Sequence, residues 1–190
     1  MNCFDPTTHI YTVNGVPVPS VTQVLAETGF IDKTWYTPAG AWRGTIVHEM
    51  LALWDCSSLD PASIDPKIAG YLEAWKKFCK EWNREEFSAI ERPLYSPLGF
   101  AGTPDRVYVD SFFVVDIKTG EIPWWAPLQI AGYVELLISA GSLWSGLAVG
   151  VREDGTYTTK AYDALAISRA RRVFRSALSC CQCIRAKGGL

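Results

Sequence analysis

Residues 112–120 have the sequence FFVVDIKTG, an apolar run that ends at Asp116 and Lys118. A strand that is apolar on both faces is typical of the centre of a sheet, where both sides are covered. Side chains two positions apart in a strand point to the same face, so Asp116 and Lys118 share one face. The segment therefore predicts a buried central strand that carries a carboxylate and an ammonium group side by side near its end.

The sequence around this strand predicts an α/β fold. Two strands are expected before it, and a helix, a hairpin and a last helix after it: residues 87–95, 100–109, 127–140, 143–151 with 156–161, and 164–186. Pro127 is a typical first residue of a helix, and Gly141 is expected to end that helix. Alternating strands and helices of this kind indicate a central mixed sheet flanked by helices.

The N-terminal part predicts a hairpin and a helical layer. The dipeptide Asn14-Gly15 is a strong hairpin signal within residues 9–19. Helices are expected at three places in this part: residues 21–27, 38–54 and 65–84. We therefore expect one domain over residues 1–190, made of the hairpin and helical layer (1–84), the sheet with the helix at residues 127–140 (85–162) and a C-terminal helix (163–190).

The composition indicates a globular chain with a large apolar core. Of its 190 residues, 48% are hydrophobic and 20% are charged, which excludes an intrinsically disordered chain. No apolar run approaches the roughly 18 residues of a membrane span, and residues 1–5 lack the basic and apolar parts of a signal peptide. We expect a cytoplasmic protein without a membrane partner, whose six cysteines stay reduced.

The charge is unevenly distributed along the chain. The net charge is −2, yet 8 basic and 3 acidic residues follow position 151. A polyanion is therefore a permitted partner of the C-terminal part. The arginines of the last helix either follow a nucleic-acid backbone or form a solvated face: Arg169, Arg171, Arg172 and Arg175.

A second carboxylate is expected beside the Asp116–Lys118 pair. Asp105 ends the sequence GTPD at residues 102–105, on the strand that precedes the central one. Two carboxylates at adjacent strand ends repel each other unless a divalent cation lies between them. A bound Mg²⁺ ion polarises a phosphoryl oxygen, and a nearby lysine orients water or offsets charge. The combination predicts phosphodiester hydrolysis, and the alternative is a surface ion pair at a strand end.

Two helical motifs extend this candidate site. His48 is a potential metal ligand on the helix at residues 38–54, and Arg43, about one turn before it, is a candidate phosphate ligand. The sequence is not H-E-x-x-H, because residue 52 is alanine. Gln129 and Tyr133 are four positions apart on one face of the next helix and can hold the lysine or a phosphate. The alternatives are an ordinary helical histidine and a polar pair on a buried helix.

In order and spacing, these motifs resemble those of the PD-(D/E)XK nuclease superfamily, in its RecB-like branch. That branch is marked by a helical histidine, a G-x-x-D strand, a D-x-K-T-G strand and a Q-x-x-x-Y helix, matched here by His48 and by residues 102–105, 116–120 and 129–133. Residues 19–25, PSVTQVL, also resemble the opening of mitochondrial genome maintenance exonucleases and similar phage exonucleases. The resemblance implies a restriction-endonuclease-like core and DNA cleavage that depends on Mg²⁺ or Mn²⁺.

The resemblance also implies a role for each matched residue. The implied metal ligands are His48, Asp105, Asp116 and the carbonyl of Ile117. Lys118 is the implied catalytic lysine, supported by Gln129 and Tyr133, which otherwise bind the substrate phosphate. Glu91 lies where many relatives carry an acid, and it either contacts the ligands or a second ion, or is a surface glutamate.

Some relatives bind an iron–sulfur cluster through one early and three late cysteines. Cys3, Cys180, Cys181 and Cys183 have a similar distribution. Adjacent residues on a helix point about 100° apart, which suits Cys180 and Cys181 poorly as joint cluster ligands. We therefore expect no cluster, and interpret these cysteines as small apolar residues of a buried helix.

The expected function is a Mg²⁺-dependent deoxyribonuclease. We expect an exonuclease that acts on DNA ends or single strands without sequence preference, in the cytoplasm of a bacterial or phage-infected cell. Replication, repair and recombination are the processes that fit it, with a replication or recombination protein as a candidate partner. The alternatives are a non-catalytic DNA-binding accessory protein that retains the fold, and a structure-specific endonuclease, which would usually form a dimer.

Overall fold

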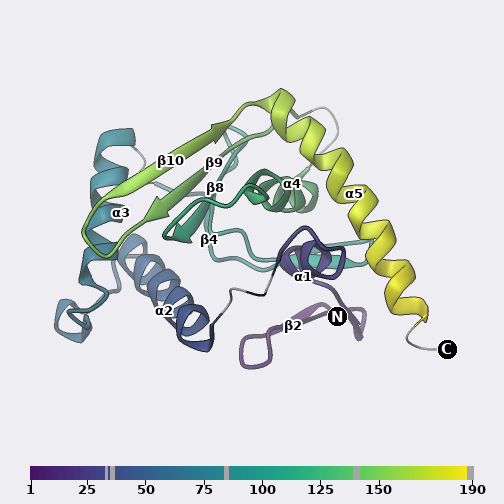
Figure 1. The fold of residues 1–190 in the computed structure, drawn as a ribbon, viewed down its shortest axis with the longest axis horizontal. Helices are drawn as coiled ribbons and strands as arrows, with labels where there is room; N and C mark the ends of the chain where they lie inside the picture. The colour runs from purple at the N-terminus through teal and green to yellow at the C-terminus, as the bar shows by residue number, and fades with distance from the viewer. Residues whose placement is uncertain (33, 35–36, 84–85, 139–141, 188–190) are drawn as a thin grey trace.

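The computed structural model describes residues 1–32, 34, 37–83, 86–138 and 142–187, and its centre is a mixed sheet (Figure 1). The strand order is β10 (Tyr157–Tyr162), β9 (Ser145–Val151), β8 (Phe113–Thr119), β7 (Arg106–Tyr108) and β4 (Ala89–Ile90). β8 and β9 are parallel, whereas the other neighbours are antiparallel. The segment predicted at residues 112–117 therefore contains the central strand, which begins one residue later, at Phe113, because Phe112 is left-handed with a φ of 50°, and continues to Thr119.

Helices cover both faces of the sheet. One face is covered by α1 (Val21–Glu27), α4 (Ala126–Leu137) and α5 (Ala164–Lys187), and the other by α2 (Pro38–Asp55) and α3 (Ala69–Trp82) (Figure 1). Along β8, Val114 packs into the first of these two core layers, and Val115 and Ile117 pack into the second. This layered α/β architecture confirms the predicted fold class.

Two predicted strands are broken in the structure. The strand expected at residues 87–95 is β4 followed by β5 (Leu94–Ser96), and the strand expected at residues 100–109 is β6 (Phe100–Gly102) followed by β7. β5 and β6 pair with each other in a separate two-stranded sheet. The physical reasons are the left-handed backbone of Glu91, with a φ of 44°, and Pro104, which has no N–H group for a ladder.

The N-terminal sheet has one strand more than predicted. β2 (Ile10–Val13) and β3 (Val16–Val18) form the expected hairpin, whose turn places Asn14 and Gly15 in left-handed conformations. β1 (Cys3–Asp5) pairs with β2 on its other side. The sheet leads into α1, which Ser20 and Gln23 cap reciprocally.

Helix boundaries differ from the predictions where side chains form local turns. α3 begins at Ala69 rather than at Asp65, because the Asp65 carboxylate accepts a hydrogen bond from the backbone N–H of Lys67. The short helix η1 (Pro61–Ser63) precedes it. Two helix ends were expected, one at Arg84 and one at residues 140–141, and both positions lie outside the described residues.

Two further expectations concern the membrane and the cysteines. Within the described part of the chain, no helix is long and apolar enough to cross a membrane. Cys181 is buried in α5, but Cys180 and Cys183 are exposed, so the interpretation of all three as buried apolar residues was wrong for two of them. At 100° per residue, Cys180 and Cys183 lie about 60° apart on the exposed side of this amphipathic helix, whereas Cys181 points to the core.

Candidate active site

Most of the predicted site residues line one cleft of about 1130 Å³. It lies where β8, the β4–β5 connection and the β6–β7 connection meet α1, α2, α4 and the N-terminal sheet. The predicted residues in its lining are Arg43, His48, Glu91, Asp105, Ile117, Lys118, Gln129 and Tyr133. Asp116 lies beneath the cleft surface with no exposed area. The structure therefore brings together side chains from segments that are far apart in the sequence.

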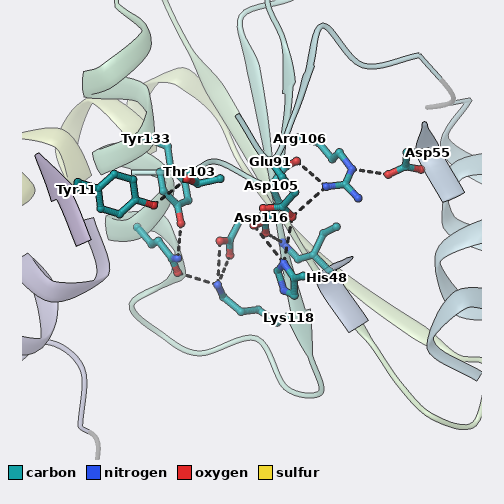
Figure 2. A network of polar contacts seen from close by, with 12 residues as sticks. Tyr11, His48, Asp55, Glu91, Thr103, Asp105, Arg106, Asp116, Lys118 and Tyr133 are labelled. Carbon is teal, nitrogen blue, oxygen red and sulfur yellow. Dashed lines mark hydrogen bonds and ion pairs between the residues drawn. The ribbon is translucent and has the colours of Figure 1, made fainter. Parts of the chain in front are cut away.

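His48, Glu91 and Asp105 form one group, called here the ligand group (Figure 2). His48 Nδ1 lies 3.4 Å from Glu91 Oε1 and 3.4 Å from Asp105 Oδ1. One potential ligand atom from each of the three residues lies within 4.8 Å of the others. The neighbouring residues Val47 and Leu51 are fully buried against α3 and the sheet, and they fix α2 so that His48 faces the cleft.

The ligand group combines acids with a charged imidazole. Burial opposes the imidazolium form, but Asp105 and then Glu91 outweigh burial and raise the pKa of His48 to about 10. Burial, followed by the charge of Asp105, raises the pKa of Glu91 above its usual value. For Asp105, burial is outweighed by His48, Lys118 and the N–H of Ile117, which together lower its pKa. Glu91 and Asp105 thus share the charge of His48, while Arg106 also stabilises the Glu91 carboxylate and Lys118 that of Asp105.

Asp105 is held in place by the backbone of β8. Arg106 pairs with Val115 in the antiparallel register of β7 and β8, so Asp105 lies directly beyond the last pair. Its Oδ2 atom accepts a hydrogen bond of 2.5 Å from the backbone N–H of Ile117. This bond leaves Oδ1 directed at His48. The structure thus shows Ile117 contacting the site through its N–H group, while its predicted role as a carbonyl ligand stays a prediction.

Asp116, Lys118, Gln129 and Tyr133 form a second group, called here the lysine group. Lys118 Nζ lies 2.8 Å from Asp116 Oδ2 and donates a 2.7 Å hydrogen bond to Gln129 Oε1. Gln129 Nε2 in turn donates to the Tyr133 hydroxyl at 2.8 Å. The expected contact between the D-x-K strand and the Q-x-x-x-Y helix is therefore present (Figure 2).

Asp116 pairs with Lys118 and is not a member of the ligand group. Burial raises the pKa of Asp116 to about 6, although the Lys118 ammonium group lowers it in part. Within the described residues, its Oδ2 atom is fully buried and its partner is the Lys118 ammonium group.

Comparisons with known proteins leave the family open. No family model matches the chain, and no curated protein matches it. A solved structure that resembles it is the alkaline exonuclease LHK-Exo of Laribacter hongkongensis, with a TM-score of 0.36 and 13% identity over 90% of this chain and 92% of that chain. At this similarity, function must be argued from the site itself.

Sequence reasoning missed the support behind Glu91 and Asp105. Arg106 is fully buried and donates to the Asp55 carboxylate, to Glu91 Oε1 at 3.2 Å and to the Asp105 carbonyl at 2.6 Å (Figure 2). Trp75 Nε1 donates to the other oxygen of Asp55 at 2.9 Å. An arginine inside a buried strand needs a carboxylate partner, which was the available signal. The sequence around Arg106 did not indicate that Asp55 is its partner.

The arginines of α5 are less available than the charge pattern suggested. Arg171 Nε lies 2.6 Å from Glu135 Oε1, and Arg175 Nη2 lies 3.0 Å from Glu135 Oε2. Glu135 belongs to α4, so these two arginines join the helices. Arg43 is exposed on α2 and lines the cleft, which makes it the better placed arginine for a phosphate.

A His48→Ala variant should bind Mn²⁺ about tenfold or more weakly than the wild type. The imidazole supplies a ligand atom, and with a pKa of about 10 it carries a proton at pH 7.5 that Mn²⁺ must displace. Wild-type affinity should therefore rise with pH, and binding should release about one proton. Calorimetry in two buffers of different ionisation enthalpy measures both quantities.

The matched control is His9→Ala, since the chain has 2 histidines and His9 is not in the ligand group. This control should keep both the affinity and the proton release. Equal Mn²⁺ affinity in the wild type and in His48→Ala would contradict a ligand role for His48.

Proposed function

We propose that the chain is a metal-dependent deoxyribonuclease that hydrolyses phosphodiester bonds. The observation that carries this proposal is the placement of the ligand group and the lysine group at one end of β8, facing one cleft. A nitrogen, several carboxylate oxygens and an adjacent ammonium group are what phosphoryl chemistry with a divalent cation requires.

The residues present fit Mg²⁺ or Mn²⁺. His48, Glu91 and Asp105 offer one nitrogen and two carboxylates within 4.8 Å of one another, and Asp116 is the further carboxylate ligand that we propose. Burial and the charge of Asp105 raise the pKa of Glu91, and a cation bound beside these two carboxylates would favour their ionised forms. When bound, the cation would polarise the phosphoryl oxygen and lower the pKa of water. The Ile117 carbonyl is the further ligand that we propose.

Lys118 would provide the positive charge beside the reacting phosphate. Its ammonium group is held by Asp116 and by Gln129, so it is oriented before the substrate arrives. In this position it can hold the attacking water or offset the charge of the transition state. Gln129 and Tyr133 position the lysine, and Arg43 contacts a neighbouring phosphate.

The proposed substrate is a DNA end or a single strand. We propose an exonuclease of replication, repair or recombination that acts in the cytoplasm, with a protein of those processes as a candidate partner. Phosphate contacts carry no sequence information, so the enzyme should cleave without a consensus.

Hydrolysis should require Mg²⁺ or Mn²⁺ and stop in EDTA. The assay uses end-labelled linear DNA and closed circular DNA, each single-stranded and double-stranded, with the cation or with chelator. Linear DNA should be degraded, and closed circular duplex should persist. Full activity in EDTA would contradict the proposal, cleavage of closed circles would indicate the endonuclease alternative, and binding without cleavage would indicate the accessory protein.

A further inference from the structure

The N-terminal sheet and the first turns of α2 both line the cleft, and Phe4, His9 and Tyr11 bring aromatic rings to it. The Phe4 and Tyr11 rings are stacked, with centroids 4.5 Å apart at 26°. The centroid of the His9 ring lies 5.5 Å from that of Phe4, and the centroid of the Tyr95 ring lies 6.2 Å from that of Tyr11. These four rings are called here the aromatic row, in the order His9, Phe4, Tyr11, Tyr95.

Within the aromatic row, exposure increases from Tyr11 to His9, and Tyr11 contacts the β6–β7 connection that carries Asp105. The Tyr11 hydroxyl is 2.8 Å from the Thr103 hydroxyl, and Thr103 stands two positions before Asp105 (Figure 2). Tyr11 is 6% exposed, Phe4 is half-buried and His9 is exposed. Phe4 and His9 therefore present ring surface to the cleft at a distance from the site that the Tyr11–Thr103 contact fixes.

A local turn holds the outer ring in place. The Asp5 carboxylate accepts hydrogen bonds from the Thr7 N–H at 2.9 Å and the Thr8 hydroxyl at 2.7 Å. His9 follows in a left-handed conformation, with a φ of 56°. This conformation is uncommon for a residue other than glycine and turns the imidazole back toward Phe4. Rings whose purpose was only to fill a core would be buried, as Tyr11 is.

From this arrangement we infer that Phe4 and His9 bind unpaired bases of a single DNA strand whose phosphate lies at the lysine group. The inference rests on the proposed function. Aromatic rings bind bases through their flat faces, which a base exposes when it is unstacked. In a duplex the faces are covered by neighbouring bases and only the edges are open in the grooves. Arg43 and Lys118 line the same cleft as Phe4 and His9, and they would supply positive charge for the backbone of the bound strand.

The test measures binding in EDTA, without hydrolysis. Fluorescence anisotropy compares a labelled 12-nucleotide oligo-dT, an abasic oligonucleotide of the same length and a 12-base-pair duplex. The wild type should bind oligo-dT at least about fivefold more tightly than the other two, which corresponds to one stacked base. Phe4→Leu, which keeps an apolar side chain, and His9→Ala should each reduce this preference, and the double variant should abolish it.

Trp82→Ala is the matched control, because Trp82 is an aromatic residue on α3 that is 39% exposed and does not line the cleft. It should bind all three ligands as the wild type does. Circular dichroism checks that each variant is folded. An unchanged preference for oligo-dT in the folded double variant, or equal binding of oligo-dT and the abasic strand by the wild type, would overturn the inference.

A hydrolysis assay in Mg²⁺ distinguishes a failure of the inference from a failure of the proposed function. Base-dependent binding without hydrolysis in Mg²⁺ would leave the base site standing and refute the nuclease. Hydrolysis in Mg²⁺ without a preference for bases would refute the base site and leave the nuclease.

Discussion

A Lys118→Ala variant should hydrolyse DNA on the order of 10²-fold or more slowly than the wild type, while still binding Mn²⁺. The change removes a charge that Asp116 and Gln129 hold in place at 2.8 and 2.7 Å. It also leaves the buried Asp116 carboxylate without its partner, so the pKa of Asp116, about 6 in the wild type, should rise. Because a carboxylate must be ionised to bind a cation, the low-pH limb of the rate profile should move to higher pH. Single-turnover rates on end-labelled DNA over a pH series measure both effects.

Lys160→Ala is the matched control for this variant. The Lys160 ammonium group lies 5.9 Å from the ring centre of Tyr162, as that of Lys118 lies 5.3 Å from the ring centre of Trp125. Lys160 is exposed on the edge strand β10, away from the cleft, so its loss should leave rate and pH profile unchanged. A Lys118→Ala rate within tenfold of the wild type, or an unmoved low-pH limb, would contradict the proposed role of the lysine.

Arg106→Met should lower the free energy of unfolding by about 3–5 kcal/mol. Methionine fills similar space, but the Asp55 side chain is 1% exposed and would lose its guanidinium partner. Burial raises the pKa of Asp55 and Arg106 lowers it, so the variant carries a carboxyl group whose folded-state pKa is higher still. The destabilisation should therefore be largest above the ordinary pKa of aspartate and become smaller as the pH falls and Asp55 takes up a proton. Urea unfolding at pH 7 and pH 5 measures the difference.

A double variant separates stability from site geometry. Asp55→Asn with Arg106→Met removes the unpaired charge but keeps an acceptor for Trp75, so it should recover much of the lost stability. Arg106→Met should also lower the affinity for Mn²⁺, because Glu91 and the Asp105 carbonyl both lose a donor. The double variant should not restore this affinity. Arg152→Met, which removes an exposed pair with Glu121, should cost at most about 1 kcal/mol. Full recovery of Mn²⁺ affinity in the double variant would refute a positioning role for Arg106.

The parts of the fold that sequence reasoning predicted well are those with a local pattern. The apolar run before Asp116 indicated a central strand because both of its faces are covered by core side chains. The spacing of Gln129 and Tyr133 indicated one helix face, and their side chains are in contact. In each case, neighbours in sequence determine the geometry, so the pattern alone was sufficient.

The parts that were missed depend on contacts between distant segments. A continuous strand at residues 87–95 agreed with composition, but the left-handed backbone of Glu91 is set by its contacts with His48, Arg106 and the Asp105 carbonyl. Pro104 was the one local signal that the following strand breaks. The pairing of Arg106 with Asp55 spans 51 positions, and nothing in either neighbourhood specifies the other.

The sequence separations within the lysine group and the ligand group have a consequence for the order in which the protein folds. The contacts of the lysine group span 2, 11 and 4 positions, within consecutive elements, whereas His48 and Glu91 are 43 positions apart. Short loops close at a lower entropy cost than long ones, so we expect the lysine group to assemble early and the ligand group late. A chain that is still folding would then hold its ammonium group without a complete set of metal ligands. Hydrolytic capacity would appear only with the last long-range contacts, and a newly made chain would be harmless to nearby DNA until its fold is closed.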